Sequence, residues 1–296
     1  MIRTILVPLD GSATAEHALP LAVSLARRAG AALRLVHVRQ ARRESSRPAS
    51  PPKEQDYLDT MAGRIRQAMH LSVHATVLDG PIAETINEHA RSVSADMIVM
   101  MTHGRGPFSR FWLGSVTDFL VRHVPAPLLV IRAPESAGES PALDTDWKPR
   151  RILVPLDGST LAEEALRPAI EIAKLANAEL TLFRVIEPIP VLAPDGMIPQ
   201  PTILDASVLE ELKTQARTYL EGKADKLRKD GLSVSCRVSI DDRVAPAILE
   251  ESREFDLVTL ATHARHGVAR MLLGSVADKV VRGAIGPVLV ARPESH

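Results

Sequence analysis

The sequence predicts an α/β protein built from two tandem, doubly wound parallel sheets. Three observations lead to this prediction: the 296-residue chain repeats itself, short apolar runs alternate with segments of helical periodicity, and a stretch rich in Pro, Ser and acidic residues separates the halves. A chain of this length is sufficient for two domains that each bury a core.

The internal repeat is visible at both ends of each half. Residues 5–38 align without a gap with residues 152–185, and both segments begin with ILVPLDGS. Residues 96–132 align in the same way with residues 256–292, and both segments contain LGSV. Agreement at both ends with variation between them indicates a duplicated domain. We therefore expect a first domain at 1–134, a linker at 135–149 and a second domain at 150–296.

The periodicity within the first half changes repeatedly between strand and helix. The β-branched apolar run at 5–7 predicts a strand buried on both faces. Residues 13–29 carry apolar side chains at helical spacing, and Gly30 supplies a stop signal. The same criteria predict strands at 32–38, 71–78, 97–101 and 128–132 and helices at 56–69, 82–92 and 114–123. Because strands and helices alternate, a parallel sheet with helices on both faces is expected.

The second half repeats this order of elements. Its second helix is predicted to be longer, at 206–229. Residues 40–53 and their counterpart at 187–205 lack periodic apolar positions, and the latter holds five prolines. We expect surface loops in both places, because irregular segments rich in proline rarely form buried elements.

The composition limits the classes of function. Lysine plus arginine and aspartate plus glutamate are equal at 36 each, so no uniform field attracts nucleic acid or an anionic membrane. No apolar run approaches the roughly 18 residues of a membrane span. The single cysteine, Cys236, excludes an intramolecular disulfide and a cysteine-based zinc site, and its alternation with valines predicts a packed or edge thiol. We therefore expect a soluble, cytoplasmic protein that binds neither nucleic acid nor a membrane.

Candidate ligand-binding residues gather where three predicted strands of the first half end. The first strand runs into Pro8, Leu9 and Asp10, the second ends at Val38 and the fourth at Met101. In an open parallel sheet, ligands bind outside the carboxyl ends of the strands, where the strand order reverses. We therefore expect a ligand at this edge.

The residues that follow these strands are suited to a phosphorylated ligand. Gly104 lets the backbone approach a phosphate closely, and the amides of Gly114, Ser115 and Val116 open a helix whose N-terminus attracts anions. Asp10 can accept a hydrogen bond from a ribose hydroxyl or a purine amine, or hold a divalent cation through water. The sequence therefore predicts an anion-binding strand edge.

These residues resemble the universal stress protein family, whose nucleotide-binding members carry the pattern Gly-x2-Gly-x9-Gly-Ser/Thr. The resemblance covers both halves nearly end to end and implies five-stranded doubly wound sheets that bind ATP, with or without Mg²⁺, across the strand ends. The contacts that it implies are Pro8, Leu9, Asp10, Val38, Met101, His103, Gly104, Arg105, Gly114, Ser115 and Val116 in the first half and Pro155, Leu156, Asp157, Val185, Ala261, His263, Ala264, Arg265, Gly274, Ser275 and Val276 in the second.

Three positions depart from the family pattern. Met101 replaces the first glycine in the first half, whereas Ala261 and Ala264 replace both early glycines in the second. If Ala264 needs a positive φ, its Cβ costs about 1 kcal/mol, and the methyl also crowds a phosphate. A tenfold change in affinity corresponds to about 1.4 kcal/mol. We therefore expect the first half to bind nucleotide more tightly.

Each of these residues also has a purely structural interpretation. Asp10 and Asp157 can cap the helices that follow them, and Gly114 with its neighbour can simply begin a helix. His103 and His263 can hydrogen-bond loop backbone without moving protons. The phosphate-loop pattern GxxxxGK[ST], the dinucleotide pattern GxGxxG after the first strand, and GxSxG are absent.

The resemblance implies a stress-response protein in which ATP occupancy acts as a sensor or switch. In relatives the fifth strands pair antiparallel across a dimer axis, so residues 128–131 and 288–291 would pair here within one chain as a pseudo-dimer. Such a unit can dimerise again or bind a protein partner. Two alternatives stay open: a nucleotide-free interaction module of the same fold, and a slow ATPase or phosphotransferase that uses Asp10 and a metal-bound nucleotide.

Overall fold

The computed structural model describes residues 1–40, 53–102, 113–132, 139–188, 206–262 and 275–293. The first half contains β1 (Thr4–Pro8), α1 (Ala13–Glu16), α2 (Leu19–Ala29), β2 (Ala32–Arg39), α3 (Lys53–Met69), β3 (Val73–Asp79), α4 (Ile82–Ser92), β4 (Met97–Thr102), α5 (Ser115–His123) and β5 (Leu128–Arg132). The second half contains β6 (Arg151–Pro155), α6 (Thr160–Glu163), α7 (Leu166–Ala176), β7 (Glu179–Ile186), α8 (Ala206–Lys229), β8 (Val234–Ile240), α9 (Val244–Glu251), the 3₁₀ turn η2 (Ser252–Glu254), β9 (Leu257–Ala261), α10 (Ser275–Gly283) and β10 (Val288–Ala291).

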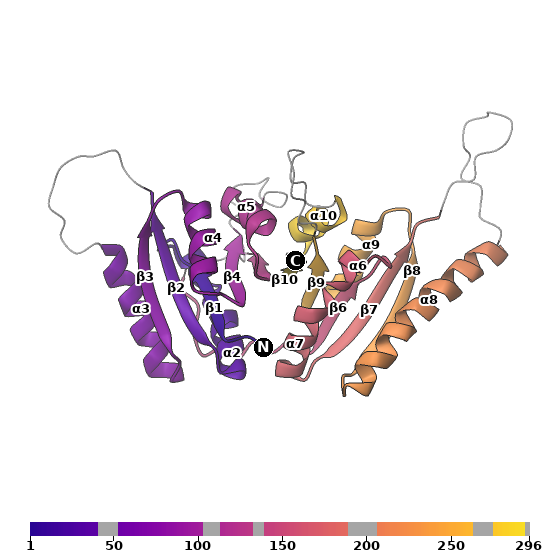
Figure 1. The fold of residues 1–296 in the computed structure, drawn as a ribbon, viewed down its shortest axis with the longest axis horizontal. Helices are drawn as coiled ribbons and strands as arrows, with labels where there is room; N and C mark the ends of the chain where they lie inside the picture. The colour runs from indigo at the N-terminus through magenta and orange to yellow at the C-terminus, as the bar shows by residue number, and fades with distance from the viewer. Residues whose placement is uncertain (41–52, 103–112, 133–138, 189–205, 263–274, 294–296) are drawn as a thin grey trace, which may run out of the picture.

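All of these strands form one sheet in the order β3-β2-β1-β4-β5-β10-β9-β6-β7-β8 (Figure 1). Within each half the neighbouring strands are parallel, and the chain order reverses beside β1 and again beside β6. This confirms the predicted α/β class and its two tandem, doubly wound halves. The two points of reversal are where a ligand cavity is expected.

The halves meet through β5 and β10, which pair antiparallel as the pseudo-dimer hypothesis expects. Leu129 lies opposite Leu289 at the centre of this pairing, and both side chains are fully buried. Polar contacts that cross the junction beside the strands include Arg282 with Asp118 at 3.3 Å, Arg132 donating to the carbonyl of Arg282, and Arg292 donating to the carbonyl of Val124 at 3.2 Å. The junction therefore joins the halves by sheet pairing, apolar packing and charge.

The single helix predicted at 13–29 is wrong, because the structure has two helices there. α1 ends at Glu16 and α2 begins at Leu19 with Pro20 in its first turn. A proline has no N–H to donate to the carbonyl four residues earlier, and its ring clashes with that carbonyl. Pro168 lies in the first turn of α7 and divides α6 from α7 in the same way.

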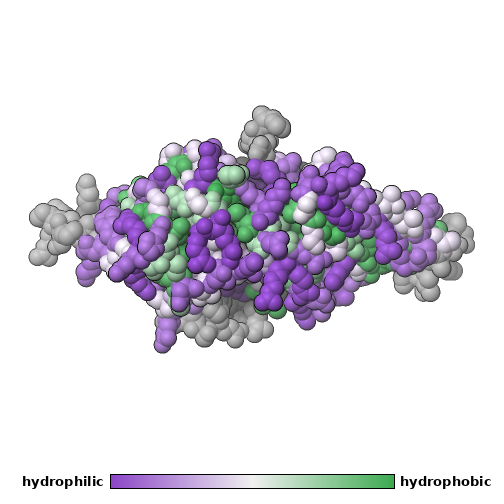
Figure 2. Space-filling model, turned by 90° about the horizontal axis from the view of Figure 1, so that it is seen from below, coloured by the Kyte–Doolittle hydropathy of each residue, from purple (hydrophilic) through white to green (hydrophobic). Residues whose placement is uncertain are grey.

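Apolar side chains fill the space between the sheet and the helices on both of its faces. One core cluster lies beneath α2, α3, α7 and α8, and a second lies beneath α4, α5, α9 and α10. The face seen from below carries mainly hydrophilic side chains, with hydrophobic residues in small patches between them (Figure 2). Among the helices of the described residues, none is long and apolar enough to cross a membrane.

The segment that connects the halves is tied to α2. Asp146 accepts hydrogen bonds from the Ser24 hydroxyl at 3.0 Å and from the Arg28 guanidinium at 2.7 and 2.8 Å. Trp147 packs against the core cluster on that face, and its carbonyl accepts a second bond from Ser24. The connection is therefore attached to the first half by side-chain contacts.

Candidate functional site

A cavity of about 270 Å³ opens in the first half at the carboxyl ends of β1, β2 and β4, where the strand order reverses. Eight of the residues predicted from the sequence border it, namely Pro8, Leu9, Asp10, Val38, Met101, Gly114, Ser115 and Val116. The remaining lining residues were not predicted; they are Ala15, Val36, Ile82, Ile86, Met100 and Thr117. Most of these are apolar and lie at strand ends or on α4, so the cavity combines an apolar wall with a polar rim.

The turn between β1 and α1 places the carboxylate of Asp10 at this rim. Gly11 adopts a φ of 81°, a left-handed conformation that favours glycine. Asp10 Oδ1 accepts hydrogen bonds from the backbone N–H of Ser12 at 3.0 Å and from its hydroxyl at 2.6 Å. The Ser12 hydroxyl oxygen in turn accepts from the N–H of Ala15, so Ser12 is the helix cap. Asp10 therefore braces the turn, and its exposed carboxylate borders the cavity.

Helix α5 begins at the same cavity without a side-chain cap. Its first residues, Ser115, Val116 and Thr117, all line the cavity, and backbone N–H groups in a first helical turn have no acceptor within their own helix. The positive end of the helix dipole adds to the attraction for an anion. A Cβ built on Gly114 would meet nothing within 4 Å, so open space adjoins this helix start. The arrangement can hold a phosphate.

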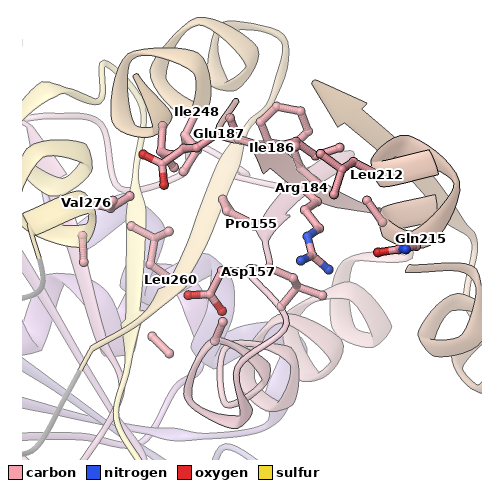
Figure 3. A pocket seen from close by; sticks show the side chains of 18 residues that line it. Pro155, Asp157, Arg184, Ile186, Glu187, Leu212, Gln215, Ile248, Leu260 and Val276 are labelled. Atoms are coloured by element: carbon pink, nitrogen blue, oxygen red, sulfur yellow. The ribbon is translucent and has the colours of Figure 1, made fainter. Parts of the chain in front are cut away.

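The second half has a larger cavity at the equivalent edge, of about 520 Å³ (Figure 3). Six of the predicted residues border it: Pro155, Leu156, Asp157, Val185, Ala261 and Val276. Ser275 begins α10 but is not among the lining residues. Sequence reasoning missed the side chains at the end of β7 and on α8 and α9, of which the main ones are Arg184, Ile186, Glu187, Leu212, Gln215 and Ile248.

The turn after β6 repeats the geometry of the first half. Gly158 has a φ of 92°, and Asp157 Oδ1 accepts from the N–H of Ser159 at 2.8 Å. Ser159 caps α6 by accepting from the N–H of Ala162 at 3.1 Å. As in the first half, the cap is the serine and the aspartate borders the cavity. Seven predicted residues lie outside the described residues: His103, Gly104, Arg105, His263, Ala264, Arg265 and Gly274.

The sequence model of the universal stress protein family matches residues 1–132 and 148–292. The chain belongs to the universal stress protein family. A universal stress protein of Mycobacterium tuberculosis is 33% identical over 202 residues, which cover 68% of this chain and 63% of that protein. One from Mycolicibacterium smegmatis is 29% identical over 230 residues, covering 75% and 70%. The chain thus spans less than two thirds of the length of the first relative.

Solved structures share the fold of this chain over both halves. A functionally unknown protein from Pseudomonas aeruginosa has a TM-score of 0.70 at 19% identity, covering 99% of this chain and 93% of that one. A universal stress protein from Archaeoglobus fulgidus has a TM-score of 0.67 at 19% identity, covering 99% and 97%. Both likenesses extend over the two halves, so the tandem fold is shared.

Each half of this universal stress protein also holds a tyrosine–carboxylate pair close to its cavity. The hydroxyl of Tyr57 donates to Glu16 at 2.9 Å, and that of Tyr219 donates to Glu163 at the same distance. Burial, and then the hydrogen bond to the carboxylate, raise the pKa of both tyrosines. In the second half the ammonium of Lys223 lies 2.6 Å from Oε2 of Glu163, and its hydrogen bond lowers the pKa of that carboxyl. The pairs join α3 and α8 to the short helices after the turns.

The single cysteine, Cys236, is a half-buried residue of β8. Burial raises the pKa of the Cys236 thiol to about 11, so the thiol stays protonated at neutral pH, as expected for a packed side chain. No set of three or more His, Cys, Asp or Glu side chains in the described residues is arranged to hold a metal ion.

Proposed function

We propose that this universal stress protein binds an adenine nucleotide, ATP above all, at its strand-edge cavities and uses occupancy as a switch in a stress response. The main observation in support of nucleotide binding is the first-half cavity. The carboxylate of Asp10 and the start of α5, which has no side-chain cap, border the same apolar pocket. The family resemblance of the LGSV segments supports the same assignment. The switch would act on a protein partner or on a second copy of the chain.

The chemistry of the lining suits each part of a nucleotide. Val38, Ile82 and Met100 offer apolar surface to a base, and Asp10 offers a carboxylate to ribose hydroxyls. The start of α5 offers backbone donors to phosphates. Ligand pockets usually measure about 300 to 1,000 Å³. The first cavity, at about 270 Å³, therefore suits the nucleoside part of ATP, with the phosphates extending along the helix start.

A nucleotide-free interaction module is the second candidate. Met101 is nearly fully buried at a cavity position where nucleotide-binding relatives carry glycine, and Ala261 occupies the equivalent place in the second half. We do not propose turnover, because Asp10 is the one titratable side chain among the described residues that line the first cavity. The two candidates differ in a single measurable property, which is nucleotide affinity.

Titration calorimetry with ATP and Mg²⁺ distinguishes them. We expect the wild type to bind ATP and Gly114→Glu to lose at least about tenfold in affinity at the first site, because a carboxylate then occupies the phosphate position. Gly114→Ala is the matched control, since a Cβ there meets nothing within 4 Å, and it should retain binding. Val276→Glu applies the same test to the second cavity. No binding by the wild type selects the interaction module.

A further inference from the structure

The second-half cavity includes a lobe that the first-half cavity lacks. Successive residues of a strand point to opposite faces of the sheet, so Val185 borders the part shared with the first cavity while Arg184 and Ile186 border a part next to α8. Leu212 and Gln215 of α8 complete this part (Figure 3). We call it the α8 lobe. No residue of α3 lines the first cavity.

Arg184 is held in the α8 lobe without an anionic partner among the described residues. Its guanidinium lies over the ring of Tyr219, 5.3 Å from the ring centre. It also passes the backbone of Gly158 so closely that a Cβ there would lie 3.4 Å from one guanidinium nitrogen. These two contacts position the group, and no hydrogen bond or ion pair within the described part of the chain uses its N–H groups. A guanidinium so placed matches a phosphate or carboxylate in bidentate geometry.

The first half carries charged side chains at the equivalent strand ends. Arg39 at the end of β2 pairs with Asp79 of β3 through two hydrogen bonds of 2.8 and 2.7 Å. At the same register position of the second half, Ile186 lies opposite Ile240. The residue three positions before the carboxylate-bonded tyrosine differs as well: it is Glu54 before Tyr57 and the small Ala216 before Tyr219. The second half therefore has apolar or small side chains at these positions, where the first half has charged ones.

We propose that the second cavity takes a nucleotide with phosphates on both sides of its ribose. A carboxylate in the position of Asp157 can accept hydrogen bonds from ribose hydroxyls. An arginine beside such a carboxylate can bind a phosphate that is esterified to the ribose 2′ or 3′ oxygen. The 5′-phosphate is directed to the start of α10, and the additional phosphate to Arg184, with the Gln215 amide as a further donor. Asp157 and Glu187 also border the cavity, so the extra phosphate must lie on the α8 side of them. This inference rests on the proposed function, because the additional group is attached to the nucleotide.

Calorimetry on the full chain carrying Gly114→Glu, which blocks the first site, tests the inference with three ligands. These are AMP, adenosine 2′,5′-bisphosphate and adenosine 3′,5′-bisphosphate. We expect one bisphosphate to bind about tenfold more tightly than AMP. Arg184→Gln should abolish this preference, whereas Arg184→Lys, which keeps the charge without the planar fork, should retain part of it.

Lys229→Gln is the matched control. It removes the same charge from the exposed far end of α8, 14 residues or about 20 Å from Gln215, and should leave the preference intact. The inference is overturned if the three ligands bind with equal affinity. It is also overturned if the preference for a bisphosphate over AMP survives at full strength in Arg184→Gln and Arg184→Lys. If AMP binds without any preference, the proposed function stands and this inference fails. If none of the three ligands binds, both fail.

Discussion

The two cavities share one turn and differ in what surrounds it. Asp10 and Asp157 each accept a hydrogen bond from the backbone N–H of the serine two residues later, at 3.0 and 2.8 Å. Each turn has a glycine with a positive φ, and each serine caps the next helix. The cavities nevertheless measure about 270 and 520 Å³. The turn is made by contacts between residues two or three apart, so duplication preserved it. Cavity size depends on side chains from separate elements, so it diverged.

A second difference is where the connecting segment is attached. Asp146 binds Ser24 and Arg28 of the first half, and the aligned positions of α7 are Glu171 and Leu175, which cannot bind a carboxylate in the same way. The comparison shows that two halves of the same fold can differ both in ligand space and in how the chain is fastened to them. The following predictions test this comparison, from the largest expected effect to the smallest.

Shortening the buried leucine on either strand of the β5–β10 junction should destabilise the protein by a similar amount. Leu129→Ala and Leu289→Ala each remove a fully buried side chain from the centre of the β5–β10 pairing, so each should lower the free energy of unfolding by about 2 to 5 kcal/mol. Urea unfolding measures the loss. Ile285→Ala is the control, because its side chain is 75% exposed. A loss confined to one of the two leucines would contradict the symmetry of the junction.

A carboxylate introduced on α8 should occupy Arg184 and so compete with a ligand phosphate in the α8 lobe. Ala216→Glu introduces a carboxylate at the position that corresponds to Glu54, next to Arg184, and should satisfy that guanidinium within the protein. We expect the preference for a ribose-phosphorylated nucleotide over AMP to fall about tenfold, or about 1.4 kcal/mol, in calorimetry. Ala216→Gln has nearly the same volume without charge and should keep most of the preference. An unchanged preference in Ala216→Glu would show that Arg184 does not hold the additional phosphate.

The two helix caps should contribute similarly to stability. Ser12→Ala and Ser159→Ala each remove a cap and should each cost about 1 kcal/mol in the free energy of unfolding. Ser12→Ala should cost slightly more, because its hydroxyl also donates to Asp10 at 2.6 Å. Thermal unfolding monitored by circular dichroism measures both losses. Ser12→Thr, which keeps a hydroxyl that can both cap the helix and donate to Asp10, should retain most of the stability; failure to do so would mean that the hydroxyl acts in another way.

The attachment of the connecting segment should be lost in acid. The hydrogen bond from Ser24, and then the pairing with Arg28, hold the pKa of Asp146 below its usual value. A carboxyl whose pKa is lower in the folded state stabilises that state above its unfolded pKa of about 3.9, and the contribution disappears as pH falls through the folded-state value. Asp146→Asn should therefore be less stable than wild type in urea at neutral pH and equal to it in strong acid. Asp144→Asn, a change at a nearby exposed carboxylate, should show no such convergence.

The order of elements was predictable because it depends on local patterns. Apolar runs and helical spacing placed β1, β2, α4 and α5 within a residue or two of their observed bounds. The break between α1 and α2 was missed although its cause, Pro20, is in the sequence, because apolar spacing on both sides continued the helical pattern. The strand predicted from residue 71 begins later, at Val73, because His70 follows α3 in a left-handed conformation with a φ of 55°.

The strand-end part of each candidate site was predictable for a topological reason. In a doubly wound sheet the carboxyl ends of the parallel strands share one edge, so Asp10, Val38 and Met101 had to approach one another. The repeat also contained a signal for the tyrosine–carboxylate pairs, because Glu16 and Glu163 occupy aligned positions. Their partners on α3 and α8 were not evident, because the spacing between them differs and the contact joins separate elements.

Sequence patterns alone therefore determined the duplication, the α/β class, the two turns and the edge at which a ligand would bind, since each follows from short-range chemistry or from the topology of parallel strands. The size of each cavity, the stacking of Arg184 on Tyr219 and the contact of Leu129 with Leu289 emerged only in three dimensions. Each of these depends on how side chains from segments dozens of residues apart fill a common volume. No local pattern encodes that packing, because it is the sum of many contacts made at once.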